Sequence, residues 1–336
     1  MKAIVCDKPF SIGIEDRPAP VRKPGEVMIR IRRVGLCGTD YHIFSGNQPF
    51  LAYPRVMGHE LAGEVAEVDA GAPLQIGQLV TINPYIPCGT CVACRKQKPN
   101  CCVNIKVLGV HVDGGMTEFI CVPAHAVIAV DGLSPDQAAM VEFLSVGAHA
   151  VRRGQVTKAD RALVVGAGPI GVGVALFCTF AGAAVTLIDT SQERLAYARD
   201  KVGIEHVKQV GEELQAFLEA RSDGEYFDVV FDATGNGKAI EKGFSYVAHG
   251  GRYVLVSVVK DTIAFSDPEF HKRETTLLGS RNATREDFEY VIENLRSGAI
   301  PSDMLRTHNF DLMDTPTMIK DLIANQGSVL KAIATF

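Results

Sequence analysis

The segment ALVVGAGPIG places three glycines directly after a short apolar strand and at the start of a helical pattern. In this context each of the three glycines can have a distinct structural role. Gly166 permits a tight turn, Gly168 lets the backbone approach a pyrophosphate, and Gly171 allows the helix to pack closely on the strand. The pattern therefore predicts a dinucleotide-binding unit. The alternative is a glycine-rich packing turn without a ligand.

A carboxylate stands at the end of the next apolar strand. Asp189 lies 23 residues after Gly166, where it would accept hydrogen bonds from the adenosine ribose hydroxyls and repel a 2′-phosphate. This favours NAD over NADP as the cofactor. Arg194 could turn toward a phosphate, although a solvated helix residue is the simpler interpretation. The predicted cofactor-binding residues are Gly166, Gly168, Pro169, Ile170, Gly171, Asp189 and Arg194.

Two patterns divide the chain. Residues 1–143 hold short β-branched runs between glycine and proline turns, which is typical of an irregular, mostly antiparallel β-domain. Residues 144–283 alternate apolar strands with helical patterns, which predicts a parallel sheet covered by helices. Residues 284–336 begin with a helical pattern and end with the strand-like run SVLKAIATF, and this pattern alone allows them to belong to either domain. The predicted fold class is α/β.

Charge and composition exclude several classes of partner. The 336 residues include 34 basic and 39 acidic side chains, a formal charge of −5, without a long basic block, so neither nucleic acid nor an anionic membrane is expected. The start, MKAIVCDKPF, has too short an apolar run for a signal peptide. Glycines and a proline interrupt the uncharged stretch 162–188, which argues against a spanning helix. We therefore expect a cytoplasmic protein that acts on small molecules.

Five of the nine cysteines fall between residues 88 and 102. In a reducing compartment, such a cluster is more often a metal site than a set of disulfides. Its spacing lets one loop surround Zn²⁺ with four thiolates and no open position, which describes a structural site made by Cys88, Cys91, Cys94 and Cys102. An iron–sulfur cluster also uses four cysteines. Cys101 could replace Cys102, and the local pattern does not decide between them.

A second group of possible ligands lies upstream, in GLCGTDYH and GHE. Cys37, His59 and Glu60 form the mixed set that suits a catalytic zinc with an exchangeable position. Thr39 and His42 follow Cys37 closely, so a hydroxyl and an imidazole could form a proton path beside that metal. Each of these residues taken alone is more often structural. Their combination with a dinucleotide fingerprint makes catalysis the better interpretation.

Together these motifs resemble the zinc-dependent medium-chain alcohol and polyol dehydrogenases. GxCGTDxH, GHE, the four-cysteine loop and GAGPIG occur in that family's order and at its distances. The resemblance implies a GroES-like catalytic domain over 1–143 and 284–336, a Rossmann domain over 144–283, and an active site in the cleft between them. It selects Cys102 as a zinc ligand and leaves Cys101 aside. It also implies a homodimer or homotetramer. The strand GGRYVLVSVV could supply a sheet edge that pairs between subunits, although burial alone also produces apolar strands.

The segment MVEFLSVGAHAVRRG resembles the sorbitol dehydrogenase branch of the family, where a glutamate occupies the position of a third protein ligand. The resemblance implies that Glu142 binds the catalytic zinc directly or through water, beside Cys37, His59 and Glu60. Phe143 stands where the family usually has proline, so the chain departs from the pattern next to this glutamate. A buried acid that only supports the ligands is the alternative for Glu142.

Three longer segments, GNQPFLAYPRVMGHE, VLGVHVDGGMTEF and FSDPEFHKRETTLLGSRNATREDF, are similar to bacterial L-galactonate 5-dehydrogenases and their starvation-sensing relatives. The resemblance implies oxidation of a secondary alcohol of a sugar acid to a ketone. A sugar acid needs cationic or hydrogen-bonding groups for its carboxylate, and the candidates are His111, Arg281 and Asn282. The alternative for these three residues is ordinary loop structure and positioning of the cofactor. Sorbitol-like polyol and threonine-like amino-alcohol dehydrogenases are alternative enzymes. A non-catalytic nucleotide-binding regulatory protein is the alternative from another class.

Overall fold

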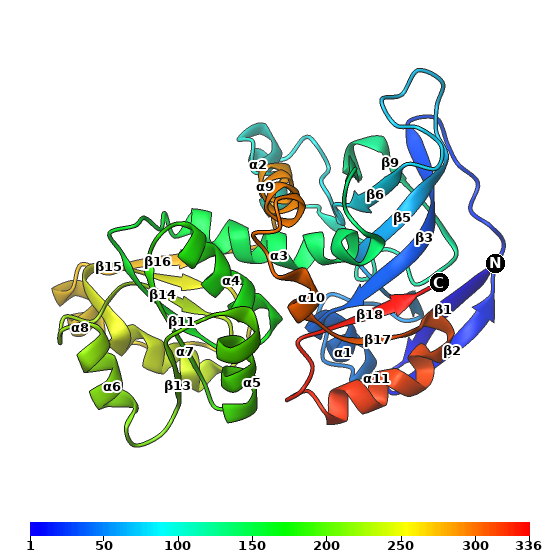
Figure 1. The fold of residues 1–336 in the computed structure, drawn as a ribbon. Coiled ribbons are helices and arrows are strands. Elements are labelled where there is room, and N and C mark those ends of the chain that lie inside the picture. The colour runs from blue at the N-terminus through cyan, green and yellow to red at the C-terminus, as the bar shows by residue number, and fades with distance from the viewer. The chain divides into compact units, whose positions relative to one another are not determined.

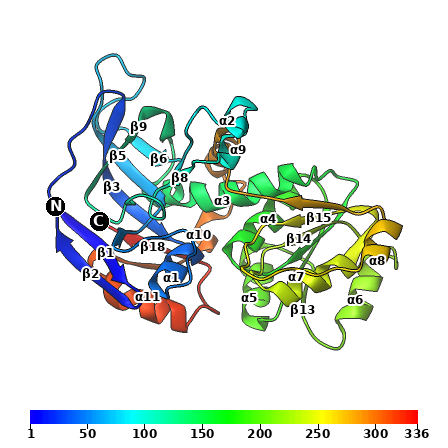
Figure 2. The same ribbon diagram turned by 180° about the vertical axis from the view of Figure 1, so that it is seen from behind.

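The computed structural model describes residues 1–336 and divides them into two compact units (Figures 1 and 2). Unit 1 comprises Met1–Phe143 and Ala283–Phe336, and unit 2 comprises Leu144–Asn282. The sequence-based boundaries lie after residues 143 and 283, so the second differs by one residue. The predicted α/β class is confirmed, because unit 1 is built mainly on antiparallel strands and unit 2 on a parallel sheet.

Unit 1 is organised around a seven-stranded sheet that is antiparallel except for its last strand pair. In sheet order its strands are β10 (Val127–Ala129), β6 (Leu79–Ile82), β5 (Glu60–Glu67), β3 (Glu26–Leu36), β18 (Lys331–Thr335) and β17 (Arg306–Asp311), with β9 (Phe119–Pro123) also paired to β3. A smaller three-stranded sheet contains β2 (Ser11–Asp16), β1 (Lys2–Lys8) and β4 (Arg55–Val56). A two-stranded sheet pairs β7 (Tyr85–Ile86) with β8 (Lys106–Val107).

Strand β3 explains how unit 1 forms its core. Its buried residues Val27, Ile29 and Ile31 alternate with more exposed ones, so one face of the strand packs into the apolar interior. At its end the strand lies between β5 and β18, where Gly35 is paired with Glu60 on one side and Ile333 on the other. Residues from both ends of the chain therefore meet at this point of the sheet.

Unit 2 contains a six-stranded, fully parallel sheet. Its order is β13 (Val207–Gln209), β12 (Ala184–Asp189), β11 (Arg161–Val165), β14 (Phe227–Asp232), β15 (Val247–Leu255) and β16 (Thr276–Gly279). In β11 and β14 consecutive residues such as Ala162–Val165 and Val229–Asp232 are buried, as expected for strands that are covered on both faces. The ribbon views show the helices that flank this sheet (Figures 1 and 2).

The helices are short, apart from α3 (Pro135–Arg153), within which the division between the units falls. Unit 1 also holds α1 (Gly38–Phe44), α2 (Val92–Arg95), α9 (Arg285–Arg296), α10 (Ser302–Leu305) and α11 (Thr315–Ala324). Unit 2 holds α4 (Pro169–Phe180), α5 (Gln192–Tyr197), α6 (Leu214–Arg221), α7 (Gly237–Gly243) and α8 (Asp267–Lys272). The remaining turns are η1 (Pro99–Cys101), η2 (Ala124–Ala126), η3 (Ala198–Val202), η4 (Phe244–Tyr246) and η5 (Leu312–Asp314).

The sheet of unit 2 decides between the two interpretations of the segment GGRYVLVSVV. This segment could supply a free sheet edge or be apolar because it is buried, and its strand β15 is hydrogen-bonded on both sides, to β14 and to β16, so it is not an edge. Its apolar composition reflects burial, and β16 is the strand that ends the sheet. No helix has both the length and the apolar character needed to cross a bilayer.

Candidate active site

The cysteine loop brings four thiols together in unit 1. The Sγ atoms of Cys88, Cys91, Cys94 and Cys102 all lie within 4.8 Å of one another. The Cys91–Cys94 and Cys91–Cys102 sulfur distances are 3.5 and 3.8 Å, close to the roughly 3.8 Å expected between thiolates at 2.3 Å from one zinc ion. Cys101 is exposed and does not belong to this group. The residues present therefore fit a closed tetrathiolate site.

The pKa values of these thiols are also compatible with binding of a metal cation. Backbone and side-chain hydrogen bonds from Thr90 lower the pKa of Cys88 to about 5, and backbone hydrogen bonds lower the pKa of Cys91. Desolvation raises the pKa of Cys94 to about 11. Because zinc binds thiolates, a bound cation would stabilise the deprotonated form that Cys94 alone resists.

Two neighbouring cysteines offer a matched test of this site. We expect Cys102→Ser to remove about one equivalent of zinc per chain and to lower the midpoint of thermal unfolding, because a closed site with three thiolates binds zinc weakly. Cys101→Ser should keep the zinc content of the unmodified protein. Metal analysis and thermal unfolding of both variants measure this. Equal zinc loss in the two variants would contradict the assignment.

The second group of candidate ligands lies around the start of α1. The ligand atoms of Cys37, His59 and Glu60 fall within 4.8 Å of one another. Buried Asp40 holds this arrangement, because its carboxylate accepts hydrogen bonds from the backbone N–H groups of Cys37 (2.9 Å) and Gly58 (3.3 Å). Asp40 was not predicted as a site residue. Its position three residues after Cys37, where a carboxylate can cap a helix, is the only signal in the sequence.

His59 is buried and its Nδ1 atom has no hydrogen-bond partner. Burial opposes the charged imidazole, but the side-chain hydrogen bond with Cys37, together with the electrostatic effects of Cys37 and of two nearby carboxylates, raises the pKa of His59. A buried imidazole with an unpaired nitrogen beside a thiol is a suitable donor set for a divalent metal ion. The residues present therefore fit the predicted catalytic zinc.

Glu60 makes a contact that the sequence did not predict. Both of its carboxylate oxygens accept hydrogen bonds from the ammonium group of Lys331, at 2.6 and 2.7 Å, and both side chains are fully buried. The ammonium group also donates to the Leu36 carbonyl (3.1 Å) and lies 4.3 Å from the centre of the Phe143 ring. A Cβ atom on Gly35 would come within 2.1 Å of Glu60 Oε2, so only glycine leaves room for this carboxylate.

Glu142 lies on α3 and takes part in a separate contact. Its carboxylate accepts a hydrogen bond from the hydroxyl of Tyr85, and both side chains are buried. Burial raises the pKa of Glu142 to about 6. Its carboxylate is not among the ligand atoms that lie within 4.8 Å of one another, so its binding to zinc stays a prediction. Phe143, which replaces the family's proline, contacts Lys331.

The other predicted site residues are distributed over both units. On α1, Thr39 is half-buried and His42 is exposed. The Nδ1 atom of His111 accepts a hydrogen bond from the Val107 N–H (3.2 Å), and its ring stacks on Phe50. The remaining two, Arg281 and Asn282, follow β16 at the end of unit 2, where Arg281 is exposed and Asn282 has a positive φ of 55°.

The glycine fingerprint adopts the geometry that a pyrophosphate requires. Gly166 has a φ of 107°, and a Cβ atom on Gly171 would lie 1.7 Å from the Gly166 carbonyl oxygen. Gly168 caps the N-terminus of α4 and has open space where a Cβ would be. The carboxylate of Asp189 accepts hydrogen bonds from Ala167 N (2.6 Å) and Ser191 N (2.7 Å), which holds it beside the turn. These residues fit a dinucleotide.

Arg194 and the remaining fingerprint residues occupy helix starts. Pro169 and Ile170 open α4, where proline suits the first turn because it needs no hydrogen-bond donor. The Arg194 N–H donates to the hydroxyl of Ser191, the residue that caps α5 (3.3 Å). Arg194 therefore belongs to the first turn of α5, and its backbone N–H is the group that the N-cap residue Ser191 accepts from.

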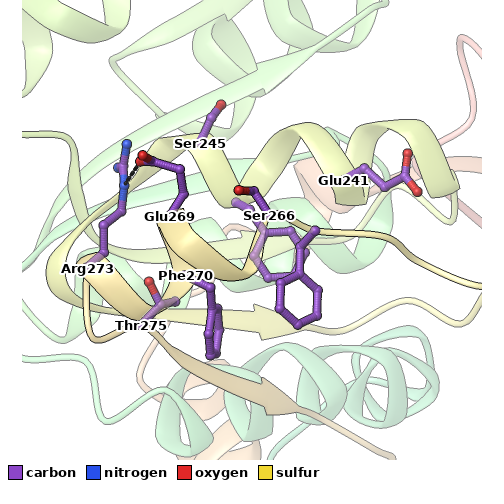
Figure 3. A pocket seen from close by; sticks show the side chains of 9 residues that line it. Glu241, Ser245, Ser266, Glu269, Phe270, Arg273 and Thr275 are labelled. Carbon is purple, nitrogen blue, oxygen red and sulfur yellow. Dashed lines mark ion pairs between the residues drawn. The ribbon is translucent and has the colours of Figure 1, made fainter.

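A separate pocket of about 210 Å³ lies in unit 2 (Figure 3). Three of the side chains that line it are Phe244, Phe265 and Phe270, and none of the predicted site residues is among its lining. Its Arg273 forms an ion pair with Glu269 (3.5 Å), and the guanidinium group lies over the ring of Tyr226. The volume is below the roughly 300–1,000 Å³ usual for ligand pockets.

Comparison with known proteins places this geometry in a family. An alcohol dehydrogenase GroES-like domain model matches residues 23–132, and a zinc-binding dehydrogenase model matches residues 169–297. The L-galactonate-5-dehydrogenase of Escherichia coli K12 is 40% identical over 100% of this chain and 99% of that protein. This chain belongs to the zinc-type medium-chain alcohol dehydrogenases.

Two further proteins match along the whole chain. The starvation-sensing protein RspB of Escherichia coli K12 is 31% identical over 100% of this chain and 99% of that protein. A crystal structure of the rspB alcohol dehydrogenase from Escherichia coli CFT073, complexed with the cofactor NADH, has a TM-score of 0.93 and 30% identity, and covers 100% of this chain and 99% of its own.

Family membership confirms several predictions made from the sequence. The protein is a zinc-dependent dehydrogenase that acts on CH–OH groups, and its cofactors are Zn²⁺ and NAD. The assignment of individual residues to the two zinc ions, to NAD and to the substrate stays a prediction. Sequence reasoning missed Lys331, Asp40 and Tyr85, each of which contacts a predicted site residue.

Proposed function

We propose that this medium-chain dehydrogenase oxidises a secondary alcohol of a sugar acid of the L-galactonate type to a ketone, with NAD as the acceptor. The observation that carries the proposal is the 40% identity to the Escherichia coli L-galactonate-5-dehydrogenase along the whole chain. The family resemblance also favours a homodimer or homotetramer. A non-catalytic regulatory protein is disfavoured, because Cys37, His59 and Glu60 are all present and clustered.

In this proposal Cys37, His59 and Glu60 hold the catalytic zinc, with Glu142 as a nearby acid. When bound, zinc supplies Lewis acidity that favours loss of the hydroxyl proton, and NAD supplies the hydride acceptor. Lys331 neutralises Glu60, so that the protein binds a divalent cation with one anionic thiolate and an already paired carboxylate. This limits the net charge buried at the site.

Two residues of α1 provide a route for the proton. Thr39 is half-buried and His42, three residues later on the same helix, is exposed. Side chains three apart on a helix are neighbours. The Thr39 hydroxyl therefore receives the proton from the substrate hydroxyl inside the site, and His42 passes it to solvent.

Recognition of the carboxylate distinguishes a sugar acid from a neutral polyol. Arg281 is the strongest candidate, because a guanidinium group binds carboxylates through charge-assisted hydrogen bonds. Asn282 and His111 are the other candidates. The hydrogen bond from Val107 and the stacking on Phe50 fix the orientation of the His111 ring, which is what a specific ligand contact needs.

The test compares substrates and arginine variants. We expect NAD reduction with L-galactonate or a close stereoisomer to exceed that with sorbitol and L-threonine. Arg281→Leu should lower kcat/KM for the sugar acid by more than about tenfold, on the order of 1.4 kcal/mol, while activity on a neutral polyol changes much less. Arg285→Leu is the matched control, because Arg285 is exposed and paired with Glu289 on α9.

Three outcomes would count against the proposal. Equal losses on both substrates would assign Arg281 to the cofactor or to the fold. An equal effect of Arg285→Leu would show that the loss reflects general surface charge. Robust oxidation of sorbitol or threonine without activity on any sugar acid would reject the substrate class in favour of the alternative dehydrogenases.

A further inference from the structure

The parallel sheet of unit 2 changes direction next to the glycine fingerprint. Chain order runs outward from β11 through β12 to β13 on one side, and from β14 through β15 to β16 on the other. In open parallel sheets a dinucleotide binds across the carboxyl ends of the strands at such a switch point. Asp189 marks the adenosine half on β12, so the nicotinamide half lies toward the ends of β14 and β15.

Asp232 is a buried carboxylate at this edge of the sheet. It is the last residue of β14 and is fully inaccessible to solvent. Its carboxylate accepts hydrogen bonds from the Thr234 N–H (3.1 Å), from the Thr234 hydroxyl (3.0 Å) and from the Ser257 hydroxyl (2.7 Å). Thr234 belongs to the loop after β14 and Ser257 to the loop after β15. One side chain therefore ties two loops together.

The backbone of Asp232 reinforces the same connection. Its carbonyl oxygen accepts hydrogen bonds from Val256 N (2.9 Å) and Ser257 N (3.3 Å) in the loop after β15. In the sheet, Asp232 is paired with Val165, the residue directly before the first glycine of the fingerprint, and with Leu255. It therefore stands between the fingerprint strand and β15.

The loop after β14 also forms one wall of the fingerprint turn. The Ala233 N–H donates to the Val165 carbonyl (2.8 Å). A Cβ atom on Gly166 would lie 2.9 Å from the Ala233 carbonyl oxygen and 3.3 Å from the Thr234 methyl group. Beyond this contact, the Thr234 hydroxyl accepts from Asn236 N (3.1 Å), and Asn236 caps α7. A displacement of Thr234 would therefore be transmitted to the turn and to α7.

Burying a carboxylate costs desolvation free energy, which argues against a purely incidental role for Asp232. Burial raises the pKa of Asp232, while the hydrogen bonds from Ser257 and Thr234 oppose that rise. An apolar residue at this position would stabilise the sheet without the desolvation cost, but it could not accept hydrogen bonds from both loops.

We propose that Asp232 is a positioning residue for the cofactor, which holds the loops after β14 and β15 in the arrangement that receives the nicotinamide half of NAD. It acts through Thr234 and Ser257 rather than by contact with the reacting atoms. The inference concerns cofactor binding and does not depend on which alcohol the enzyme oxidises.

The test separates the two halves of the cofactor in the purified zinc-loaded enzyme without substrate. NADH binding is measured by fluorescence titration and AMP binding by calorimetry. We expect Ser257→Ala to raise the Kd of NADH about fivefold, or about 1 kcal/mol, and Asp232→Asn to raise it about tenfold. The Kd of AMP, which occupies only the adenosine half, should stay within about twofold of its original value.

Ser222→Ala is the matched control for a purely structural effect. Ser222 is a buried serine whose hydroxyl donates to Leu218 O (2.8 Å), and it lies near the amino end of the sheet, where its carbonyl accepts from Arg161 of β11. This variant should lower thermal stability without changing either Kd. Equal weakening of AMP and NADH by Asp232→Asn and Ser257→Ala, or an unchanged NADH Kd in both, would overturn the proposal.

Discussion

Cys37→Ser should lower kcat/KM by about 10³-fold or more, on the order of 4 kcal/mol of transition-state stabilisation, while the protein remains folded. The reason is the donor set. Cys37 supplies the only thiolate beside His59 and Glu60, and Glu60 is already paired with Lys331. A serine hydroxyl is a poor replacement for a thiolate, so the variant should lose about one equivalent of zinc. Metal analysis and steady-state kinetics measure the two effects together.

Cys121→Ser is the matched control for this substitution. Cys121 is a half-buried cysteine on β9 of the same unit and belongs to neither cysteine-containing ligand group. Its substitution should leave zinc content and turnover close to those of the unmodified enzyme. If Cys37→Ser retained its full zinc content and activity, the catalytic site would have to be sought elsewhere in the chain.

Lys331→Met should give the largest loss of stability. The substitution leaves Glu60 buried without its cation, and breaking one partner of a buried ion pair costs about 3–5 kcal/mol. The free energy of unfolding of the metal-free protein, from urea titration, measures this cost. The zinc-loaded protein should lose less, because a divalent cation beside Glu60 takes over part of the neutralisation.

Two further variants make this prediction specific. Lys2→Met breaks an exposed ion pair with Asp16 (2.7 Å) and should leave the free energy of unfolding almost unchanged, because solvent screens exposed ion pairs. The double variant Lys331→Met with Glu60→Gln removes the unpaired charge and should recover much of the lost stability. If Lys331→Met unfolded at the same urea concentration as the unmodified protein, Glu60 would have to be protonated or hydrated rather than held as a buried ion pair.

Local motifs were readable because their partners are close in the chain. The fingerprint around Gly166 and the loop from Cys88 to Cys102 each lie within fewer than twenty residues, and their spacing limits what geometry they can adopt. The alternation of strands and helices in residues 144–283 likewise indicated a parallel sheet, because each strand must be followed by a crossover. Helix α9 and strand β18 fall where the pattern of the last segment places them.

Contacts between distant segments were not readable in the same way. Lys331 meets Glu60 across 271 residues of sequence, because β3 pairs with β5 on one side and with β18 on the other. The run SVLKAIATF indicated a final strand, but nothing in its pattern gave a partner for its lysine. Only the position of that strand in the sheet shows that its side chain is buried against a predicted zinc ligand.

The same limit applies to β15 and to Asp232. An apolar run has the same composition whether it forms an edge or an interior strand, and the pairing with β16 decides that β15 is interior. Asp232 ends a strand as many aspartates do, and its importance depends on Ser257, which another strand carries to it. Chain spacing thus determined the ligand types, the fingerprint and the fold class, because these depend on local geometry. Strand order and register decided how the buried charges are paired, because those interactions act through space between segments that the sequence separates.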